Sequence, residues 1–223
     1  MELDREGHDG IFVVFEGIDG AGTTTQVERY AAYQRSRRRA VHVTREPSSG
    51  PVGSLIRLVL SERISLPLTN QAELMTLLFA ADRLDHVAVE IAPHLREGSL
   101  VLSDRYDLSS LAYQSSTVAE PRDPAPIVDW IRQCNCYARR PDVTVVLDVS
   151  PDVAAARRRL RGGAREIFDD IDLQVRLARA YRSAEQLVPR DRVIHVDGDP
   201  DAEAVAAAVI AALGPLLDAS KNR

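Results

Sequence analysis

Lysine is almost absent from this chain. Among its 223 residues Lys221, close to the C-terminus, is the single lysine, and every other strongly basic residue is an arginine. An arginine must therefore supply the positive charge of any site that the rest of the chain builds. The formal net charge of −5 also argues against a general polyanion-binding surface, so we expect no nucleic-acid partner.

Cysteines and long apolar runs are scarce as well. Cys134 and Cys136 cannot complete a tetrahedral metal site by themselves, and we expect both to be ordinary reduced thiols. No run approaches the roughly 20 apolar residues that a membrane span requires, and Met1–Gly10 contains no apolar signal region. The sequence thus predicts a cytoplasmic protein without a membrane partner.

The composition that is present is that of an ordinary globular protein, with 45% hydrophobic residues in a length that suits a single domain, 1–223. Short apolar segments predict five buried parallel strands, which helical patterns separate. The expected strands are Ile11–Phe15, Ala40–Thr44, Leu100–Ser103, Val143–Asp148 and Val193–Val196. The expected helices are Thr24–Ser36, Gly53–Ser61, Gln71–Arg96, Ser109–Gln114, Ile127–Tyr137, Pro151–Arg161, Asp170–Leu187 and Pro200–Leu217, before a disordered tail at 218–223. This alternation predicts a three-layer α/β fold whose ligands bind beyond the carboxyl ends of the strands.

The turn after the first strand is glycine-rich and typical of a phosphate-binding P-loop. Gly17 and Gly22 have the required spacing, and the following helix would direct its N-terminus at an anion. Thr24 stands where a Mg²⁺-binding hydroxyl belongs, but Thr23 occupies the position of the expected lysine. The residues predicted to bind ATP are Gly17, Ile18, Asp19, Gly20, Ala21, Gly22, Thr23, Thr24 and Thr25.

Charged residues follow two other strands. Asp104 comes directly after the third strand, where an unpaired carboxylate is costly to bury, and we expect it to hold Mg²⁺ together with Thr24. Arg105 beside it could pair with Asp104 or bind a substrate phosphate. Arg45 follows the second strand in a turn rich in proline and glycine, which is either a plain surface turn or a second phosphate site.

An arginine-rich segment predicts a mobile cationic lid at about 157–170. Five arginines surround Gly162 and Gly163 in this segment. A run of charges is usually a solvated helix face, but arginines on a hinged segment can close over a transferring phosphoryl group. Arg161 and Arg165, on either side of the two glycines, are our preferred candidates.

Two helices carry candidates for binding a nucleoside. Phe79 is either a core residue or a ring on which a base stacks, with Arg83 one turn further along the helix. We expect Ser109 to cap the helix that follows the third strand, a role that Asp107 would suit equally. Other polar side chains of that helix could meet a base or a sugar, namely Ser110, Tyr113 and Gln114.

In this order the motifs resemble those of bacterial thymidylate kinase, which phosphorylates dTMP with ATP. The resemblance covers nearly the whole chain and rests on Phe15–Gly22, Thr44–Pro47, Leu78–Arg83, and Asp104–Tyr106 with Ser109–Ser110 and Ala112–Gln114. It implies a P-loop nucleoside monophosphate kinase-like fold with a five-stranded parallel sheet and a small arginine-rich lid. It also implies ATP with Mg²⁺, nucleotides as small-molecule partners, and a homodimer.

The resemblance implies roles for single residues too. Asp19 is similar to the carboxylate that meets the deoxyribose 3′-hydroxyl, Arg45 to the arginine on the dTMP phosphate, and Phe79 to the ring that stacks on thymine. The implied dTMP-binding residues are Asp19, Arg45, Pro47, Phe79, Arg83, Arg105, Ser110, Tyr113 and Gln114. The implied catalytic residues are Asp19, Arg105, Arg161 and Arg165, and the implied metal ligands are Thr24 and Asp104.

The chain departs from the family pattern at Thr23, which replaces a lysine, and at Ala164, which replaces an aspartate of the lid. We favour an active thymidylate kinase in which a lid arginine supplies the missing charge. The alternatives are a nucleotide-binding regulatory protein with weakened catalysis and a kinase for another nucleoside monophosphate. The retained acceptor motifs argue against wholesale loss of activity.

Overall fold

A computed structural model describes residues 10–117, 125–161 and 171–219. Five parallel strands form one sheet in the order β2-β3-β1-β4-β5, which confirms the predicted α/β fold. The strands are β1 (Ile11–Glu16), β2 (Val41–Arg45), β3 (Leu100–Asp104), β4 (Val143–Asp148) and β5 (Val193–Asp197). Apart from β4, each strand ends one residue later than expected, on a charged side chain. The register aligns Phe15 and Arg45 with Asp104, so the carboxyl ends of β1, β2 and β3 lie side by side.

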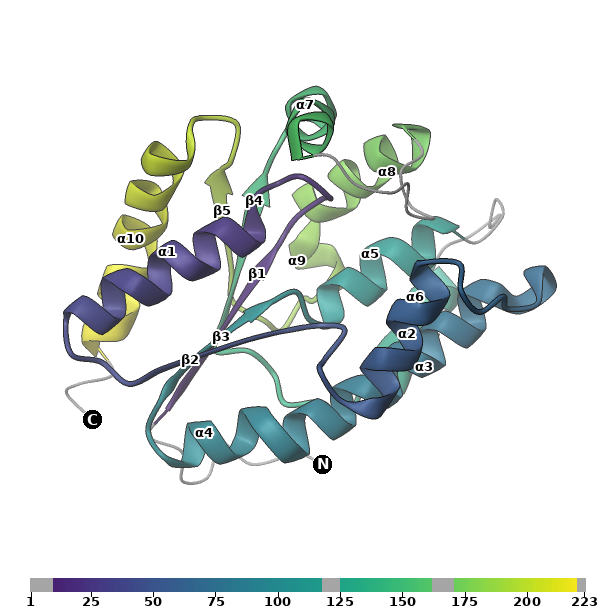
Figure 1. The fold of residues 1–223 in the computed structure, drawn as a ribbon, viewed down its shortest axis with the longest axis horizontal. Helices are drawn as coiled ribbons and strands as arrows, with labels where there is room; N and C mark the ends of the chain where they lie inside the picture. Colours follow the sequence, from purple (N-terminus) through teal and green to yellow (C-terminus); the bar gives the residue numbers. More distant parts are fainter. Residues whose placement is uncertain (1–9, 118–124, 162–170, 220–223) are drawn as a thin grey trace.

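Helices cover both faces of the sheet (Figure 1). On one face, α1 (Thr23–Ser36) packs against α10 (Ala202–Ala219). The opposite face carries α4 (Ala92–Arg96), α5 (Asp107–Thr117) and α8 (Ile171–Arg182). The remaining helices are α2 (Pro51–Leu60), the short turn η1 (Leu68–Asn70), α3 (Gln71–His86), α6 (Ala125–Cys134), α7 (Pro151–Arg161) and α9 (Ala184–Leu187).

Two expectations about helices need correction. The helix expected over Gln71–Arg96 is present, but η2 (Val87–Ile91) between α3 and α4 is π-helical. Pro93 gives a physical reason, because it has no N–H for the carbonyl of Val89 and its ring crowds that carbonyl. The final helix continues to Ala219, so the tail expected at 218–223 begins inside α10, and 220–223 lie outside the described residues.

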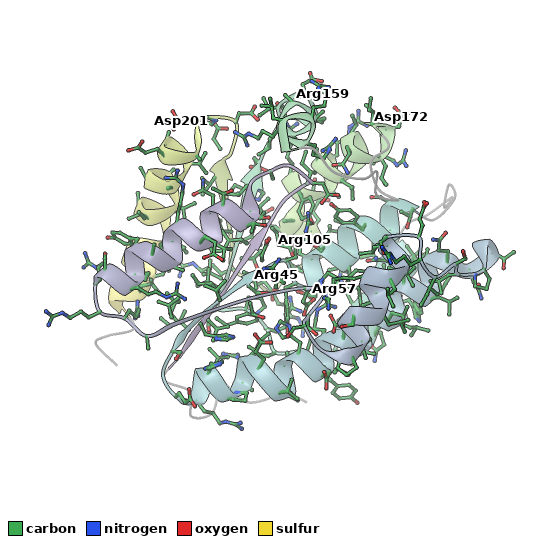
Figure 2. The ribbon with its side chains drawn as sticks, viewed as in Figure 1. Arg45, Arg57, Arg105, Arg159, Asp172 and Asp201 are labelled. Atoms are coloured by element: carbon green, nitrogen blue, oxygen red, sulfur yellow. The ribbon has the colours of Figure 1, made fainter. Side chains whose placement is uncertain are left out.

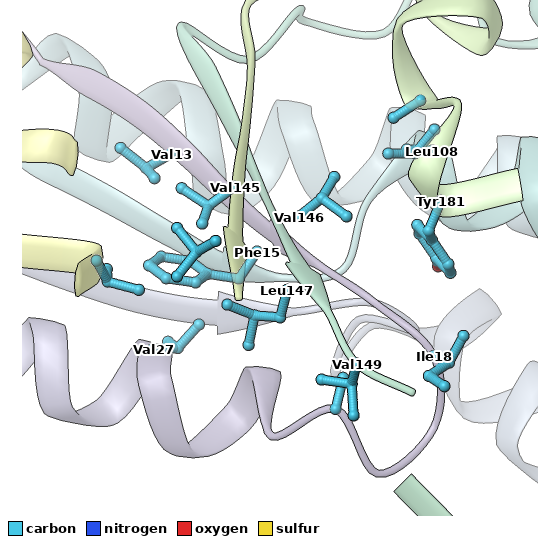
Figure 3. Close-up of a cluster of buried hydrophobic side chains, with 14 of the residues drawn as sticks. Val13, Phe15, Ile18, Val27, Leu108, Val145, Val146, Leu147, Val149 and Tyr181 are labelled. Atoms are coloured by element: carbon cyan, nitrogen blue, oxygen red, sulfur yellow. The ribbon is translucent and has the colours of Figure 1, made fainter. Parts of the chain in front are cut away.

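The central strand is buried because both faces of the sheet are covered. Phe15 points to one face and meets Tyr30 of α1, with ring centroids 6.1 Å apart. Phe12 points to the other and meets the ring of Tyr106 edge-on at 5.1 Å. Figure 3 shows the first of these clusters, where Val27 of α1 lies beneath Phe15. The continuous apolar run of β1 is therefore the pattern of a strand with no solvated side.

The described helices include none that is both long and apolar enough to cross a membrane.

We expect Phe12→Ala to lower the free energy of unfolding by about 3–5 kcal/mol, because the buried ring would leave a cavity beside Tyr106. Urea unfolding measures this change. Leu160→Ala is the control, since that side chain is 89% exposed and its loss should cost under about 0.5 kcal/mol. Equal effects of the two substitutions would contradict the packing of β1 on both faces.

Candidate active site

The P-loop connects the carboxyl end of β1 to the N-terminus of α1. Gly20 and Gly22 have φ angles of +91° and +92°, in the left-handed region that favours glycine. Gly22 precedes the first residue of α1, Thr23, and no side chain caps this N-terminus. The first backbone N–H groups of a 14-residue helix are therefore available to an anion.

A pocket of about 460 Å³ lies at this helix N-terminus. The P-loop and the first turn of α1 contribute residues from Asp19 to Gln26, and the rest come from the end of β3, from α7 and from the segment after β5 that leads into α10. The lining residues outside the P-loop are Gln26, Asp104, Arg105, Arg157, Arg158, Gly198, Asp201, Ala202 and Val205. Of the residues predicted to bind ATP, only Gly17 and Ile18 are not part of this lining. Thr23 lines the pocket with an uncharged side chain that is largely buried.

The structure brings Thr24 and Asp104 into direct contact. The Thr24 hydroxyl donates a hydrogen bond to Oδ2 of Asp104. Oδ1 of Asp104 is buried and has no hydrogen-bond partner among the described residues. A hydroxyl beside a carboxylate with an unsatisfied oxygen suits Mg²⁺, which binds few protein ligands and retains water or phosphate oxygens. The two residues thus fit the ion that the P-loop predicts.

Asp19 and Arg105 form an ion pair, with 2.5 Å between Oδ1 and Nη2. Nη1 of Arg105 also donates to the Gly17 carbonyl at 3.0 Å, to Ser109 Oγ at 3.2 Å and to Tyr181 Oη at 3.3 Å. The pairing with Asp104 that the sequence left open is not formed. Arg105 therefore joins the P-loop to helices α5 and α8.

Sequence reasoning missed a role for Glu16, the last residue of β1. Its buried carboxylate accepts hydrogen bonds from the backbone N–H groups of Tyr106 and Ser109, at 2.8 and 3.1 Å. It also accepts from the hydroxyls of Ser109 at 2.6 Å and Tyr181 at 3.1 Å. Glu16 thus binds the N-terminus of α5. A glutamate that ends an otherwise apolar strand was the available signal, because a buried carboxylate requires partners.

The expectation that Ser109 caps α5 is wrong. Ser109 lies inside the first turn of the helix, and its hydroxyl donates to Glu16. Glu16 satisfies the terminal N–H groups that a capping side chain would otherwise take.

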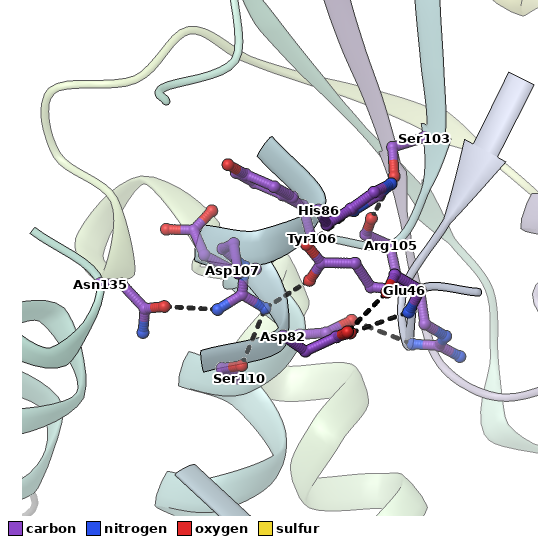
Figure 4. A network of polar contacts seen from close by, with 12 residues as sticks. Glu46, Asp82, His86, Ser103, Arg105, Tyr106, Asp107, Ser110 and Asn135 are labelled. Atoms are coloured by element: carbon purple, nitrogen blue, oxygen red, sulfur yellow. Dashed lines mark hydrogen bonds and ion pairs between the residues drawn. The ribbon is translucent and has the colours of Figure 1, made fainter. Parts of the chain in front are cut away.

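Arg83 is fully buried at 1% exposure, and its guanidinium holds several segments together. Nη2 donates to Glu46 Oε2 at 2.6 Å and to Ser110 Oγ at 3.2 Å, and Nη1 donates to Asn135 Oδ1. Figure 4 labels Glu46, Ser110 and Asn135, the three residues that accept these hydrogen bonds. The guanidinium also lies 5.0 Å from the ring centroid of Tyr106. Arg83 and Ser110, both assigned to dTMP by resemblance, are thus in contact.

Two further residues of α5 lie one turn beyond Ser110. Tyr113 is buried with its ring centroid 5.4 Å from the Arg105 guanidinium. Burial raises the pKa of the Tyr113 hydroxyl well above its usual value, and the carboxylate of Asp19 adds to this effect. Gln114 is also buried, and its Oε1 has no hydrogen-bond partner within the described ranges. The helix therefore connects the Asp19–Arg105 pair with the Arg83 cluster.

The other acceptor candidates lie around the end of β2. Arg45 is exposed at that end, and a cis peptide bond joins Glu46 to the half-buried Pro47. Arg57 of α2 donates to the carbonyl of Pro47 at 3.1 Å and steadies this turn. Phe79 is half-buried and packs against the apolar cluster between α2 and α3, in partial agreement with its interpretation as a core residue.

The arginine-rich lid is described only in part. Arg161 is the last residue of α7, and Arg165 lies outside the described residues. The arginines of α7 that line the pocket are Arg157 and Arg158, which sequence reasoning did not prefer. A repeat of arginines along a helix does not reveal which of them faces the loop. Both cysteines, Cys134 and Cys136, are free.

A sequence model of the thymidylate kinase family matches residues 15–209. The chain belongs to the thymidylate kinase family. Thymidylate kinase of Bifidobacterium longum strain NCC 2705 is 40% identical over 208 residues, which cover 90% of this chain and 96% of the relative. A probable thymidylate kinase of Pyrococcus horikoshii is 36% identical over 187 residues, or 83% and 88% of the two chains. This family consists of nucleoside monophosphate kinases that use ATP, so the chain is a kinase of that class.

We expect the stability of this kinase to depend on pH through Glu16. Burial raises the pKa of its carboxyl from 4.5 to about 7, against the opposing effects of Arg105 and the hydrogen bonds. Between these pH values the folded protein binds more protons than the unfolded chain. The stability that this group contributes is therefore complete below about pH 4.5 and is lost as the pH rises to about 7, by on the order of 3 kcal/mol.

Glu16→Gln should remove this part of the pH dependence, because an amide does not titrate. Urea unfolding between about pH 5 and 7 measures the slope. Glu28→Gln, at an exposed position of α1, should keep the wild-type slope. A Glu16→Gln variant with the wild-type slope would contradict the assignment of this titration to Glu16.

Proposed function

We propose that this chain phosphorylates dTMP to dTDP with ATP and Mg²⁺, as a thymidylate kinase of the bacterial type. The observation that carries the proposal is the ion pair between Asp19 and Arg105. Asp19 belongs to the pocket of the P-loop, and Arg105 lies against Tyr113 of the helix that carries the acceptor candidates. A donor nucleotide and an acceptor nucleotide would therefore meet at these two side chains.

The reaction is an in-line transfer. A phosphate oxygen of dTMP attacks the γ-phosphorus of ATP, and the bond from that phosphorus to the bridging oxygen of ADP breaks. Such a transfer needs positioning and charge neutralisation rather than a protein nucleophile. The N–H groups at the start of α1 would bind the phosphates of ATP. Thr24 and Asp104 would hold Mg²⁺, which supplies positive charge to these phosphates when it is bound.

Two unsatisfied buried atoms support thymine as the base of the acceptor. Nε of Arg83 is a donor without a hydrogen-bond partner, and Oε1 of Gln114 is an acceptor without one, among the residues that the structure describes. The edge of thymine offers a carbonyl next to an N–H, which complements one donor and one acceptor. This supports dTMP as an acceptor.

Thr23 cannot supply the positive charge that the P-loop lysine would bring to the phosphates of ATP, so another residue must supply it. We propose that an arginine of α7 or of the lid after it supplies this charge, with Arg161 and Arg165 as the candidates from the sequence. The loss of one charged stabiliser would cost about 3–4 kcal/mol of transition-state stabilisation, or roughly a hundred- to thousandfold in rate. The backbone N–H groups of the P-loop are unaffected, so binding of ATP would survive better than turnover.

We expect the purified protein to form ADP from ATP in the presence of dTMP and Mg²⁺, in a coupled spectrophotometric assay. Thr24→Ala is the control and should lower turnover strongly, because it removes a proposed metal ligand. Turnover of dUMP, dCMP and dGMP in the same assay should be lower than that of dTMP. Activity at the Thr24→Ala level would favour a regulatory nucleotide-binding protein, and a preference for another monophosphate would identify a different acceptor.

A homodimer is the second part of the proposal. Five exposed apolar side chains belong to α2, α3 and η2, and α2 packs beside α3 (Figure 1). They are Leu55, Leu58, Leu77, Leu84 and Val89. Single exposed apolar residues need no explanation, but several on adjoining helices are typical of an interaction surface.

We expect light scattering after size-exclusion chromatography to give twice the mass of one chain. Leu77→Glu should lower this mass to that of a monomer, because the side chain is 51% exposed and a charge there would be desolvated in an interface. Leu160→Glu, at an exposed position of α7, should leave the dimer intact. A monomeric wild type, or a dimer that tolerates Leu77→Glu, would contradict this surface.

A further inference from the structure

Three arginines line the pocket of the P-loop within the described part of the chain, and each of them makes contacts of its own. Arg105 is ion-paired with Asp19. Arg157 donates from Nη1 to the carbonyls of Ala21 at 3.3 Å and Gly198 at 2.8 Å. Its Nη2 donates to two more carbonyls after β5, those of Asp199 at 3.0 Å and Pro200 at 2.8 Å. Arg157 thus fastens the P-loop to the segment before α10.

Arg158 reaches the P-loop from the adjacent position of α7. Its Nη1 donates a hydrogen bond to the carbonyl of Asp19, inside the loop that lacks the lysine. Its side chain also lines the pocket together with Thr23 and Thr24. The guanidinium therefore stands at the loop that would hold the phosphates of ATP.

Close packing of α7 on the P-loop places Arg158 there. A Cβ atom built on Gly20 would lie 2.5 Å from the carbonyl oxygen of Ala154 and 3.1 Å from Cγ of Arg158. No side chain fits at position 20 without moving the backbone of the helix. The positive φ of Gly20 and this contact both require glycine, and together they let α7 approach the loop.

We propose that Arg158 is the cation that acts on the phosphoryl groups of ATP in place of the P-loop lysine. This inference rests on the proposed kinase function and names one arginine for the charge that it needs. A guanidinium carries five N–H donors in a planar fork, so it can hold a backbone carbonyl and a phosphate oxygen at once. Lysine would reach the phosphates from the N-terminus of α1, whereas Arg158 reaches them from α7 across the pocket.

Steady-state kinetics of the full chain with ATP and dTMP test this assignment. Arg158→Met keeps the apolar stem beside Gly20 and removes the charge, and should lower kcat by about a hundredfold or more. Arg159→Met is the matched control, since Arg159 is exposed on the outer side of the same helix (Figure 2) and should retain wild-type turnover. Thr23→Lys should restore most of the lost turnover in the Arg158→Met background and change the wild type little.

The outcomes distinguish this inference from the proposed function. Equal turnover of Arg158→Met and Arg159→Met in an active protein overturns the role of Arg158 alone. Thr23→Lys could also raise turnover by the same factor in the wild type and in Arg158→Met. This result overturns the role of Arg158 as well, because the charge at position 23 and the charge of Arg158 would then act independently. An inactive wild type that Thr23→Lys activates overturns both proposals. Thermal unfolding verifies that the variants fold. If Arg158→Met does not fold, the neutral polar variants take its place, and Arg158→Gln with turnover equal to that of Arg159→Gln overturns the assignment.

Discussion

The buried carboxylate of Glu16 is the constraint on which the geometry of the site depends. It ends β1 and gathers the N-terminus of α5 and the hydroxyl of Tyr181 in α8. Ser109 and Tyr181 also contact Arg105, which pairs with Asp19 in the P-loop. The P-loop and α5 are therefore held through one set of hydrogen bonds and ion pairs. A carboxylate is suited to this task because a single group accepts from several donors.

A second buried charge, Arg83, organises the proposed acceptor side in a similar way. It joins α3 to Glu46, to Ser110 in α5 and to Asn135 after α6. Buried ion pairs are weak contributors to stability, since desolvation offsets much of their attraction. They do fix the relative positions of the groups that they join, because breaking them leaves a charge unpaired. We therefore interpret Arg83 as a residue that positions these groups rather than one that adds stability.

Much of the fold could be predicted because its signals are local. The apolar run of β1, the glycines of the P-loop and the charged residues after β2 and β3 each follow from short-range chemistry. The partners of Arg105 and Glu16 could not be predicted, since they depend on which helix faces come together. The sequence likewise favoured Arg161 and Arg165, because they flank a pair of glycines that could act as a hinge. The contact of Arg158 with the P-loop depends instead on how closely α7 approaches Gly20, which no local pattern shows. Pro93 did carry a local signal for the π-helical segment, which the helical periodicity around it obscured.

If Arg158 supplies the charge of the donor site, as we propose, the contact between α7 and Gly20 also changes what holds that charge in place. A lysine in a P-loop is kept in place by the loop itself, through covalent neighbours and local backbone bonds. Arg158 is kept in place by tertiary packing between segments far apart in the sequence. Local unfolding of α7 would withdraw the cation while the sheet and the P-loop remained folded. In such a kinase we expect heat inactivation to precede global unfolding, so that one helix rather than the core would set the thermal limit of activity.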